Sequence, residues 1–312
     1  MSRVLVTGSL VYDTIMNFPG QFKEHILPDK THILNVSFLV DSLNKHFGGT
    51  AGNIAYNLSL LGLSPQVMAT AGRDFWEYED WLKLNKIKYK YLKIHNEDYT
   101  AQAYITTDKE DNQITAFHPG AMKYAGKLSL HDIKEKPDLM IVAPNDLKAM
   151  EKYVAEASEF KLRMIFDPGQ QIPSFSKESL KNCLSKANYT IVNDYELELV
   201  LKKTELSQSE ILKNSEALLV TKGNLGSIIH TKKKSYNIPA FTPEKIVDPT
   251  GCGDAYRAGI IYGILAHLDW ETTGRIASLL AAYKIARHGG QNHKFTLEDF
   301  KEKFTEWTGK NV

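Results

Sequence analysis

The chain has 312 residues, and its 38 Lys and Arg against 37 Asp and Glu leave a formal charge of +1. This balance provides no basic surface for a nucleic acid or an anionic membrane, so we expect neither as a partner. The two cysteines, Cys183 and Cys252, fit neither a disulfide framework nor a zinc motif, and the first residues lack the apolar stretch of a signal peptide. We therefore expect a cytoplasmic globular protein.

Short β-branched segments alternate with helical segments through most of the chain, which predicts a mostly parallel sheet between two layers of helices. The predicted strands cover residues 4–7, 66–69, 139–142, 164–167, 189–192 and 217–221. The predicted helices lie near residues 50–62, 74–85, 146–159, 177–187, 194–203, 254–268, 271–287 and 296–306. Ligands of such a three-layer α/β/α core bind at the carboxyl ends of the strands.

Two segments interrupt this alternation, residues 15–47 and residues 99–118. Their alternating polar and apolar residues predict antiparallel strands, which we expect to form a small β lid over the strand ends. The core would then comprise residues 1–14, 48–98 and 119–312. The alternative is that both segments are surface excursions without a function.

Two polar clusters follow the first predicted strand. Ser9 and Asp13 come after its carboxyl end, where an acidic side chain can hold two hydroxyls of a sugar. Gly48, Gly49 and Asn53 open the next helix, where glycines let a ligand approach the backbone and the amide can donate and accept hydrogen bonds. The alternatives are a solvated aspartate and a glycine-rich turn with a capping residue.

The sequence DPTGCGD at residues 248–254 directly precedes an apolar helix. Backbone N–H groups of Gly251, Cys252 and Gly253 would face an anion at the helix N-terminus and stabilise a phosphoryl group in transfer. Asp254 would lie beside that anion, where a carboxylate suits a general base for an acceptor hydroxyl. The alternative is that Asp254 only caps the helix and that the glycines only form a turn.

Together these segments resemble the ribokinase-like (PfkB) carbohydrate and nucleoside kinases. GGTAGN at residues 48–53 resembles the N-terminal signature of that family, and DPTGCGDAYRAG at residues 248–259 resembles its C-terminal signature. The resemblance spans nearly the whole chain and implies a ribokinase-like α/β fold and ATP-dependent phosphorylation. Pro249 and Cys252 depart from the usual C-terminal signature, and we expect the helix N-terminus to lower the thiol pKa of Cys252.

The resemblance also implies how ATP and Mg²⁺ are bound. Asn193 and Glu196 would act on Mg²⁺ mainly through water, although an Asn and a Glu at a helix start can also be a simple cap. Thr221, Gly223 and Gly226 would border the nucleotide. Asp248 and Asn292 would complete the nucleotide site or a site for K⁺.

Within the family, residues 117–122, 167–171 and 289–293 look most like microbial adenosine kinases. Phe117 on a lid strand would stack on a purine, and Gln170 and Gln171 would pair with its polar edge. The alternative for Phe117 is simple packing.

We therefore expect an enzyme that phosphorylates the 5′-hydroxyl of a purine ribonucleoside, and adenosine is the expected substrate. One alternative is a ribokinase-like sugar kinase that acts on ribose or a similar small sugar. The other is a nucleoside-binding protein without catalytic activity, since a fold alone does not establish a reaction. A homodimer through the lid is the expected assembly.

Overall fold

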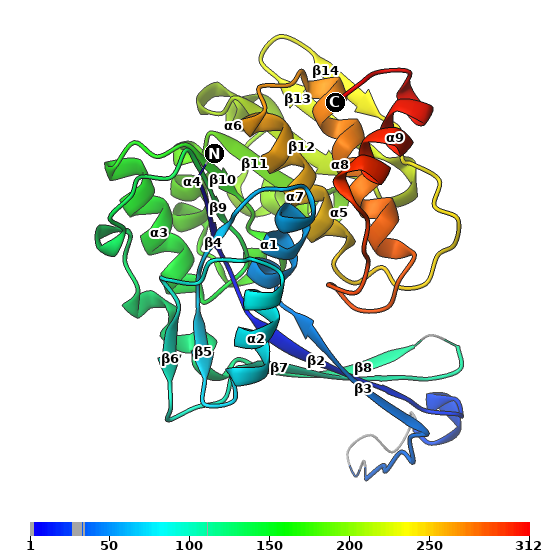
Figure 1. Cartoon of the computed structure of the whole chain (residues 1–312). Helices are drawn as coiled ribbons and strands as arrows, with labels where there is room; N and C mark the ends of the chain where they lie inside the picture. The colour runs from blue at the N-terminus through cyan, green and yellow to red at the C-terminus, as the bar shows by residue number, and fades with distance from the viewer. Residues whose placement is uncertain (1–2, 27–32, 34, 111) are drawn as a thin grey trace.

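The computed structural model of the chain describes residues 3–26, 33, 35–110 and 112–312. An eight-stranded sheet in the order β14-β13-β12-β11-β10-β9-β1-β4 runs through its centre (Figure 1). The six predicted strands are confirmed and pair in parallel, as β1 (Val4–Thr7), β4 (Gln66–Met68), β9 (Leu139–Val142), β10 (Met164–Phe166), β11 (Tyr189–Asn193) and β12 (Ala217–Thr221). A hairpin that we did not predict, β13 (Ser227–Thr231) and β14 (Ser235–Ile238), extends one edge in antiparallel pairing.

Helices cover both faces of this sheet, because successive strand residues point to opposite sides. In β1, Val4 and Val6 belong to one apolar core and Leu5 belongs to the other. The first core contains α1 (Thr50–Leu60), α2 (Trp76–Leu84), α7 (Cys252–Leu265), α8 (Trp270–Ile285) and α9 (Leu297–Thr308). The second contains α3 (Leu147–Glu159), α4 (Lys177–Lys186), α5 (Asp194–Thr204) and the short α6 (Gln208–Asn214), which we did not predict. The three-layer architecture is therefore confirmed.

The helix α7 lies at the centre of its layer and packs closely against α8. A Cβ atom at Gly259 would lie 2.4 Å from the Cα atom of Ala277, so a larger residue would force the two helices apart.

A second sheet of four strands projects from the core (Figure 1). Its order is β3 (Ser42–Gly48), β2 (Val11–Asn17), β7 (Ala101–Thr107) and β8 (Gln113–His118). Both predicted lid segments contribute to this sheet, which we call the lid, although it already begins at Val11. Residues 27–32, 34 and 111 of those segments, like residues 1–2 of the predicted core, lie outside the described residues.

Strand register decides which lid residues face the core. Asp13 pairs with Ala103, and Ala103 pairs with Phe117, so these three side chains share one face of the lid. Met16 pairs with Leu43 and Thr106, and Thr106 pairs with Ile114, so these residues share the opposite face.

Smaller elements complete the described chain. The strands β5 (Thr70–Gly72) and β6 (Lys93–His95) form a two-stranded sheet. Short 3-10 helices connect the larger elements: η1 (Phe22–Glu24), η3 (Gly120–Lys127), η4 (Leu130–Asp132), η5 (Gly169–Ser174) and η6 (Gly223–Leu225). None of the helices within the described ranges has the length and apolar character needed to cross a membrane.

Candidate active site

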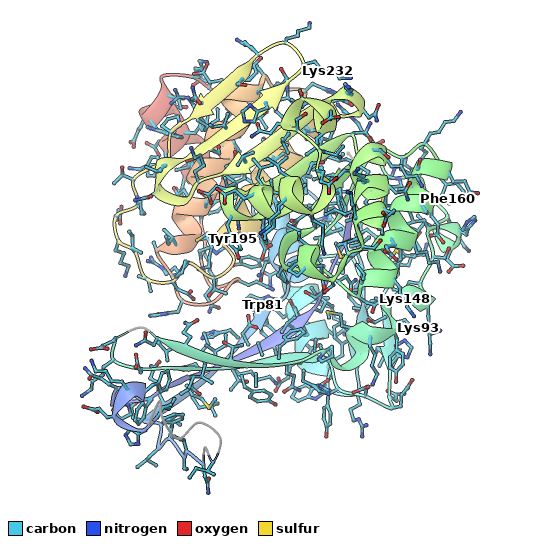
Figure 2. The ribbon with its side chains drawn as sticks, turned by 180° about the vertical axis from the view of Figure 1, so that it is seen from behind. Trp81, Lys93, Lys148, Phe160, Tyr195 and Lys232 are labelled. Atoms are coloured by element: carbon cyan, nitrogen blue, oxygen red, sulfur yellow. The ribbon has the colours of Figure 1, made fainter. Side chains whose placement is uncertain are left out.

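A cavity of about 950 Å³ lies between the carboxyl ends of the parallel strands and the lid. This is the edge at which open α/β sheets bind ligands. Figure 2 shows Tyr195, which lines the cavity, at the border of the core that faces the lid. The cavity brings together these predicted site residues: Ser9, Asp13, Gly49, Asn53, Phe117, Gln170, Gln171, Asn193, Glu196, Thr221, Gly223, Gly251, Gly253 and Asp254.

The N-terminus of α7 opens into this cavity. Gly251 adopts a φ of +79°, which glycine tolerates, and no side chain caps the first turn. Among the described residues, the N–H groups of Gly251 and Gly253 have no backbone partner, whereas the N–H of Cys252 donates to the Pro249 carbonyl at 3.1 Å. Two of the three predicted anion donors therefore remain available, and the third closes a turn.

Asp254 lies at the floor of the cavity and is not the helix cap, since that position belongs to Gly251. Its Oδ2 accepts a hydrogen bond from Nδ2 of Asn53 at 2.8 Å. Protein crowds the carboxylate on its other sides, and this burial raises the pKa of Asp254 to about 6, while Arg257 and the Asn53 hydrogen bond act to lower it. The group is therefore ionised near neutral pH but remains basic enough to receive a proton.

Asn53 holds this carboxylate because its own amide is fixed. The Gln291 Nε2 donates to the Asn53 Oδ1 at 3.1 Å, and the Gln291 Oε1 accepts from the Trp81 Nε1 at 2.7 Å. Asn53 therefore orients Asp254, and its predicted contact with sugar hydroxyls stays a prediction. One hydrogen of its amide nitrogen is left for a ligand.

Asp13 occupies the lid side of the same cavity and is only 8% exposed. Burial raises the pKa of Asp13 to about 7, and the nearby Asp248 and Asp254 carboxylates add to the shift. A Cβ atom at Gly48 would lie 2.0 Å from the Asp13 Oδ2, and one at Gly49 would lie 2.5 Å from the Ser9 carbonyl oxygen. Gly48 therefore leaves room for the Asp13 carboxylate, and Gly49 lets the start of α1 approach the Ser9 backbone.

The predicted base-binding residues lie across the cavity from one another. Phe117 projects from β8 with 51% of its surface exposed and belongs to none of the apolar clusters, which argues against the packing alternative. Gln170 and Gln171 begin η5 on the core side. The Gln171 Nε2 donates to the Asn145 carbonyl at 2.8 Å, which leaves its Oε1 as an acceptor.

A second cavity of about 450 Å³ adjoins the first and shares Thr221, Gly223 and Gly253 with it. Gly226 and Cys252 also line it, together with apolar side chains such as Ile246. An apolar slot beside a helix N-terminus suits a planar base attached to a phosphate chain.

Asn193 and Glu196 line the large cavity and also form a capping box at the start of α5. The Glu196 carboxylate accepts from the Asn193 N–H at 2.8 Å, and burial raises the pKa of Glu196. Within the described ranges, no group of three or more His, Cys, Asp or Glu side chains could hold a metal ion. The Asn193 amide and the Glu196 carboxylate have oxygen atoms that could accept hydrogen bonds from waters of a Mg²⁺ ion, and this role stays a prediction.

Asp248 and Asn292 line neither cavity. The Asp248 carboxylate accepts from the N–H groups of Thr250 and Gly289, at 2.8 and 2.7 Å, and so ties two loops together. The Nζ of the buried Lys284 donates to the Asp248 carbonyl at 2.7 Å, which places a protein ammonium beside this loop.

The expectation for the Cys252 thiol is wrong. Burial raises the pKa of Cys252 to about 11, although the nearby Lys284 acts to lower it. The Asp248 and Asp254 carboxylates add to the effect of burial, and this thiol is protonated at neutral pH.

Sequence reasoning missed several residues of the cavity, chiefly Arg257, Asp167, Asn145 and Tyr195. Arg257 follows Asp254 by three positions, and helix geometry places such residues on one face, so the spacing contained a usable signal. The sequence gives a weaker signal for Asp167, because only the folded chain brings the end of β10 next to α7.

Comparisons with known proteins agree with this geometry. A family model described as pfkB family carbohydrate kinase matches residues 1–296. A nucleoside kinase of Methanocaldococcus jannaschii is 33% identical over 305 residues, which cover 97% of each chain. The structure of a Burkholderia thailandensis nucleoside kinase in complex with inosine superposes with a TM-score of 0.90 at 41% identity, covering 99% of both chains. A second structure of that kinase, in complex with ADP-inosine, gives a TM-score of 0.88 at 42% identity, covering 99% of this chain and 97% of the other.

Proposed function

Because the chain belongs to the pfkB family of carbohydrate kinases, and is therefore a phosphotransferase, we propose that its acceptor is a purine ribonucleoside. ATP would donate its γ-phosphoryl group to the 5′-hydroxyl, with adenosine as the first substrate to test. The nucleoside kinases among the relatives, one of them in complex with inosine, support this choice over a simple sugar.

One observation carries the proposal: Asp254 and the unpartnered N–H groups of Gly251 and Gly253 meet in a cavity that also holds Asp13 and Phe117. The 5′-oxygen forms a bond to the γ-phosphorus as the bond from that phosphorus to ADP breaks. The hydroxyl proton passes to Asp254, and the two N–H groups stabilise charge on the phosphoryl oxygens. Asn53 keeps the accepting carboxylate in position.

Asp13, Ser9 and Gly49 would hold the ribose, since a carboxylate accepts from two vicinal hydroxyls at once. The exposed ring of Phe117 would stack on the base. Gln170 and Gln171 would offer amide groups to the polar edge of a purine, which a bare sugar does not have.

ATP would enter from the side of the smaller cavity, past Thr221, Gly223 and Gly226. Asn193 and Glu196 would hold the waters of a Mg²⁺ ion, which would offset the negative charge of the ATP phosphates. The predicted potassium site near Asp248 is tested by comparing turnover with and without added K⁺. We place the reaction in the cytoplasm, in line with the free thiols of Cys183 and Cys252.

A panel of acceptors tests the choice of substrate. ATP consumption is measured with adenosine, inosine, guanosine, cytidine, uridine and ribose, and phosphorus NMR identifies the hydroxyl that is modified. We expect kcat/KM for adenosine to exceed that for ribose by at least about a hundredfold, as a site with base-specific hydrogen bonds requires. A preference for ribose would replace the proposal with the sugar-kinase alternative.

The variant Asp254→Asn tests the base in the same assay. Turnover should fall at least about a hundredfold, because the amide cannot take the proton. Nucleoside affinity, measured by calorimetry, should stay within about threefold, because the amide retains the size of the carboxylate and a hydrogen-bond acceptor for Asn53. Near-normal turnover would remove Asp254 from the reaction.

A further inference from the structure

Charge is distributed unevenly in the large cavity. Five acidic side chains line it, those of Asp13, Asp167, Asp194, Glu196 and Asp254, whereas Arg257 is the one basic side chain in its described lining. A cavity that accepts a nucleoside triphosphate must offset several negative charges. The position of Arg257 therefore indicates where the protein places positive charge against the phosphates.

Two of the three guanidinium nitrogens of Arg257 are occupied. Nη2 donates to the Asp167 Oδ1 at 2.7 Å, and Nε donates to the Asp167 Oδ2. Asp167 is fully buried at the end of β10, so this bidentate pair holds the guanidinium in one orientation. Burial opposes the positive charge, but the contact with Asp167 outweighs it and raises the pKa of Arg257.

The third nitrogen, Nη1, donates to none of the described side chains or carbonyls. It lies over the first turn of α7, where a Cβ atom on Gly253 would come within 2.6 Å of it. Gly253 is also one of the two residues whose unpartnered N–H groups form the anion site. The free guanidinium nitrogen and the anion donors therefore converge on one place beside Asp254.

This arrangement exceeds what a structural ion pair requires. A lysine could neutralise Asp167, but its single ammonium could not also reach the anion site. Charge builds up on the equatorial oxygens of a phosphoryl group during transfer, and a guanidinium fixed beside them stabilises it. We propose that Arg257 is a catalytic residue whose Nη1 contacts the phosphoryl group as it moves from ATP to the acceptor.

The proposal rests on phosphoryl transfer from ATP and not on the identity of the acceptor. It is therefore tested with whichever acceptor the wild-type enzyme turns over. If that acceptor is a sugar, the nucleoside proposal fails while the role of Arg257 is still measured.

The variant Arg257→Lys keeps a positive charge for Asp167 and removes Nη1, the nitrogen that would contact the phosphoryl group. We expect kcat to fall at least about a hundredfold, the usual effect of losing one donor to a charged transition state. The affinity for ADP should stay within about threefold, whereas the affinity for the β,γ-imido analogue of ATP should fall at least about tenfold. An unchanged kcat, or an equal loss of affinity for both nucleotides, would overturn the proposal.

Two further variants separate catalysis from folding. The double variant Arg257→Gln with Asp167→Asn removes both buried charges together, so it avoids an unpaired carboxylate, and its thermal melting reports folding. We expect it to melt cooperatively with kcat still reduced at least about a hundredfold. Arg275→Lys on α8 is the matched control, since Arg275 pairs with Glu271 away from the cavity, and it should retain wild-type kcat. A folded double variant with near-normal kcat would also overturn the proposal.

Discussion

The carboxylates of Asp13 and Asp254 lie in one cavity, and burial raises the pKa values of both groups, to about 7 and about 6. Each must be ionised to act, Asp254 to receive a proton and Asp13 to accept from two hydroxyls. The rate should therefore report the ionisation of both carboxylates.

We expect log kcat/KM to be constant above about pH 8 and to fall below it, with a slope that approaches two below about pH 6. In Asp13→Asn the slope should reduce to one, because only Asp254 still titrates. The measurement is a pH profile at saturating ATP. A flat profile between about pH 8 and pH 5 would contradict these assignments.

The buried carboxylate of Asp13 also lowers the stability of the folded protein. Its folded pKa of about 7 lies above the unfolded value, so the folded form binds the proton more tightly. This loss in the free energy of unfolding is absent below about pH 4, grows as the pH rises, and is fully present above about pH 7. Asp13→Asn should therefore raise the melting temperature by about 2–5 °C at about pH 8 and leave it unchanged at about pH 4. Calorimetry that shows no gain at the higher pH would contradict the shift.

At the scale of elements, the junction between β3 and α1 shapes the lid side of the site. Gly48→Ala would push a methyl group against the Asp13 carboxylate and displace it. We expect KM for the nucleoside to rise at least about tenfold while KM for ATP stays within about twofold. Gly126→Ala is the matched control, because its Cβ would meet nothing nearer than 3.8 Å. Unchanged kinetics for Gly48→Ala would show that Asp13 does not hold the acceptor.

The sequence predicted those helices and strands whose apolar pattern or flanking glycines lie within the element itself or next to it. The strand 139–142 is a continuous apolar run, and α7 begins directly after Gly251, so both were predicted close to their observed bounds. The hairpin of β13 and β14 was missed because its short strands mix polar and apolar residues at a sheet edge. The pair of Asp167 and Arg257 was missed because 90 positions separate its members and only the closed fold joins them.

At the scale of the whole molecule, the lid face that carries Met16 and Ile114 presents exposed apolar side chains in the part of the chain that the structure describes. Leu43, Tyr104 and Ile114 lie on this face with 64%, 43% and 42% of their surfaces exposed. Monomeric proteins seldom leave such an apolar sheet face uncovered, so we propose that a second copy of the chain covers it.

Light scattering tests this assembly. The wild-type chain should elute with twice its mass of 35.2 kDa, and Ile114→Lys should elute at 35.2 kDa. Leu225→Lys is the control, since Leu225 is 74% exposed on η6, outside the lid, and this variant should stay dimeric. A wild-type chain that is monomeric at micromolar concentration would contradict the proposed dimer.

A crystal structure with adenosine and ADP bound tests the central claim most directly. The 5′-oxygen should lie within about 3.2 Å of the Asp254 carboxylate, with the ADP phosphates directed at the N–H groups of Gly251 and Gly253. A nucleoside bound with its 5′-oxygen turned away from Asp254, or nucleotide phosphates held far from the first turn of α7, would contradict the account.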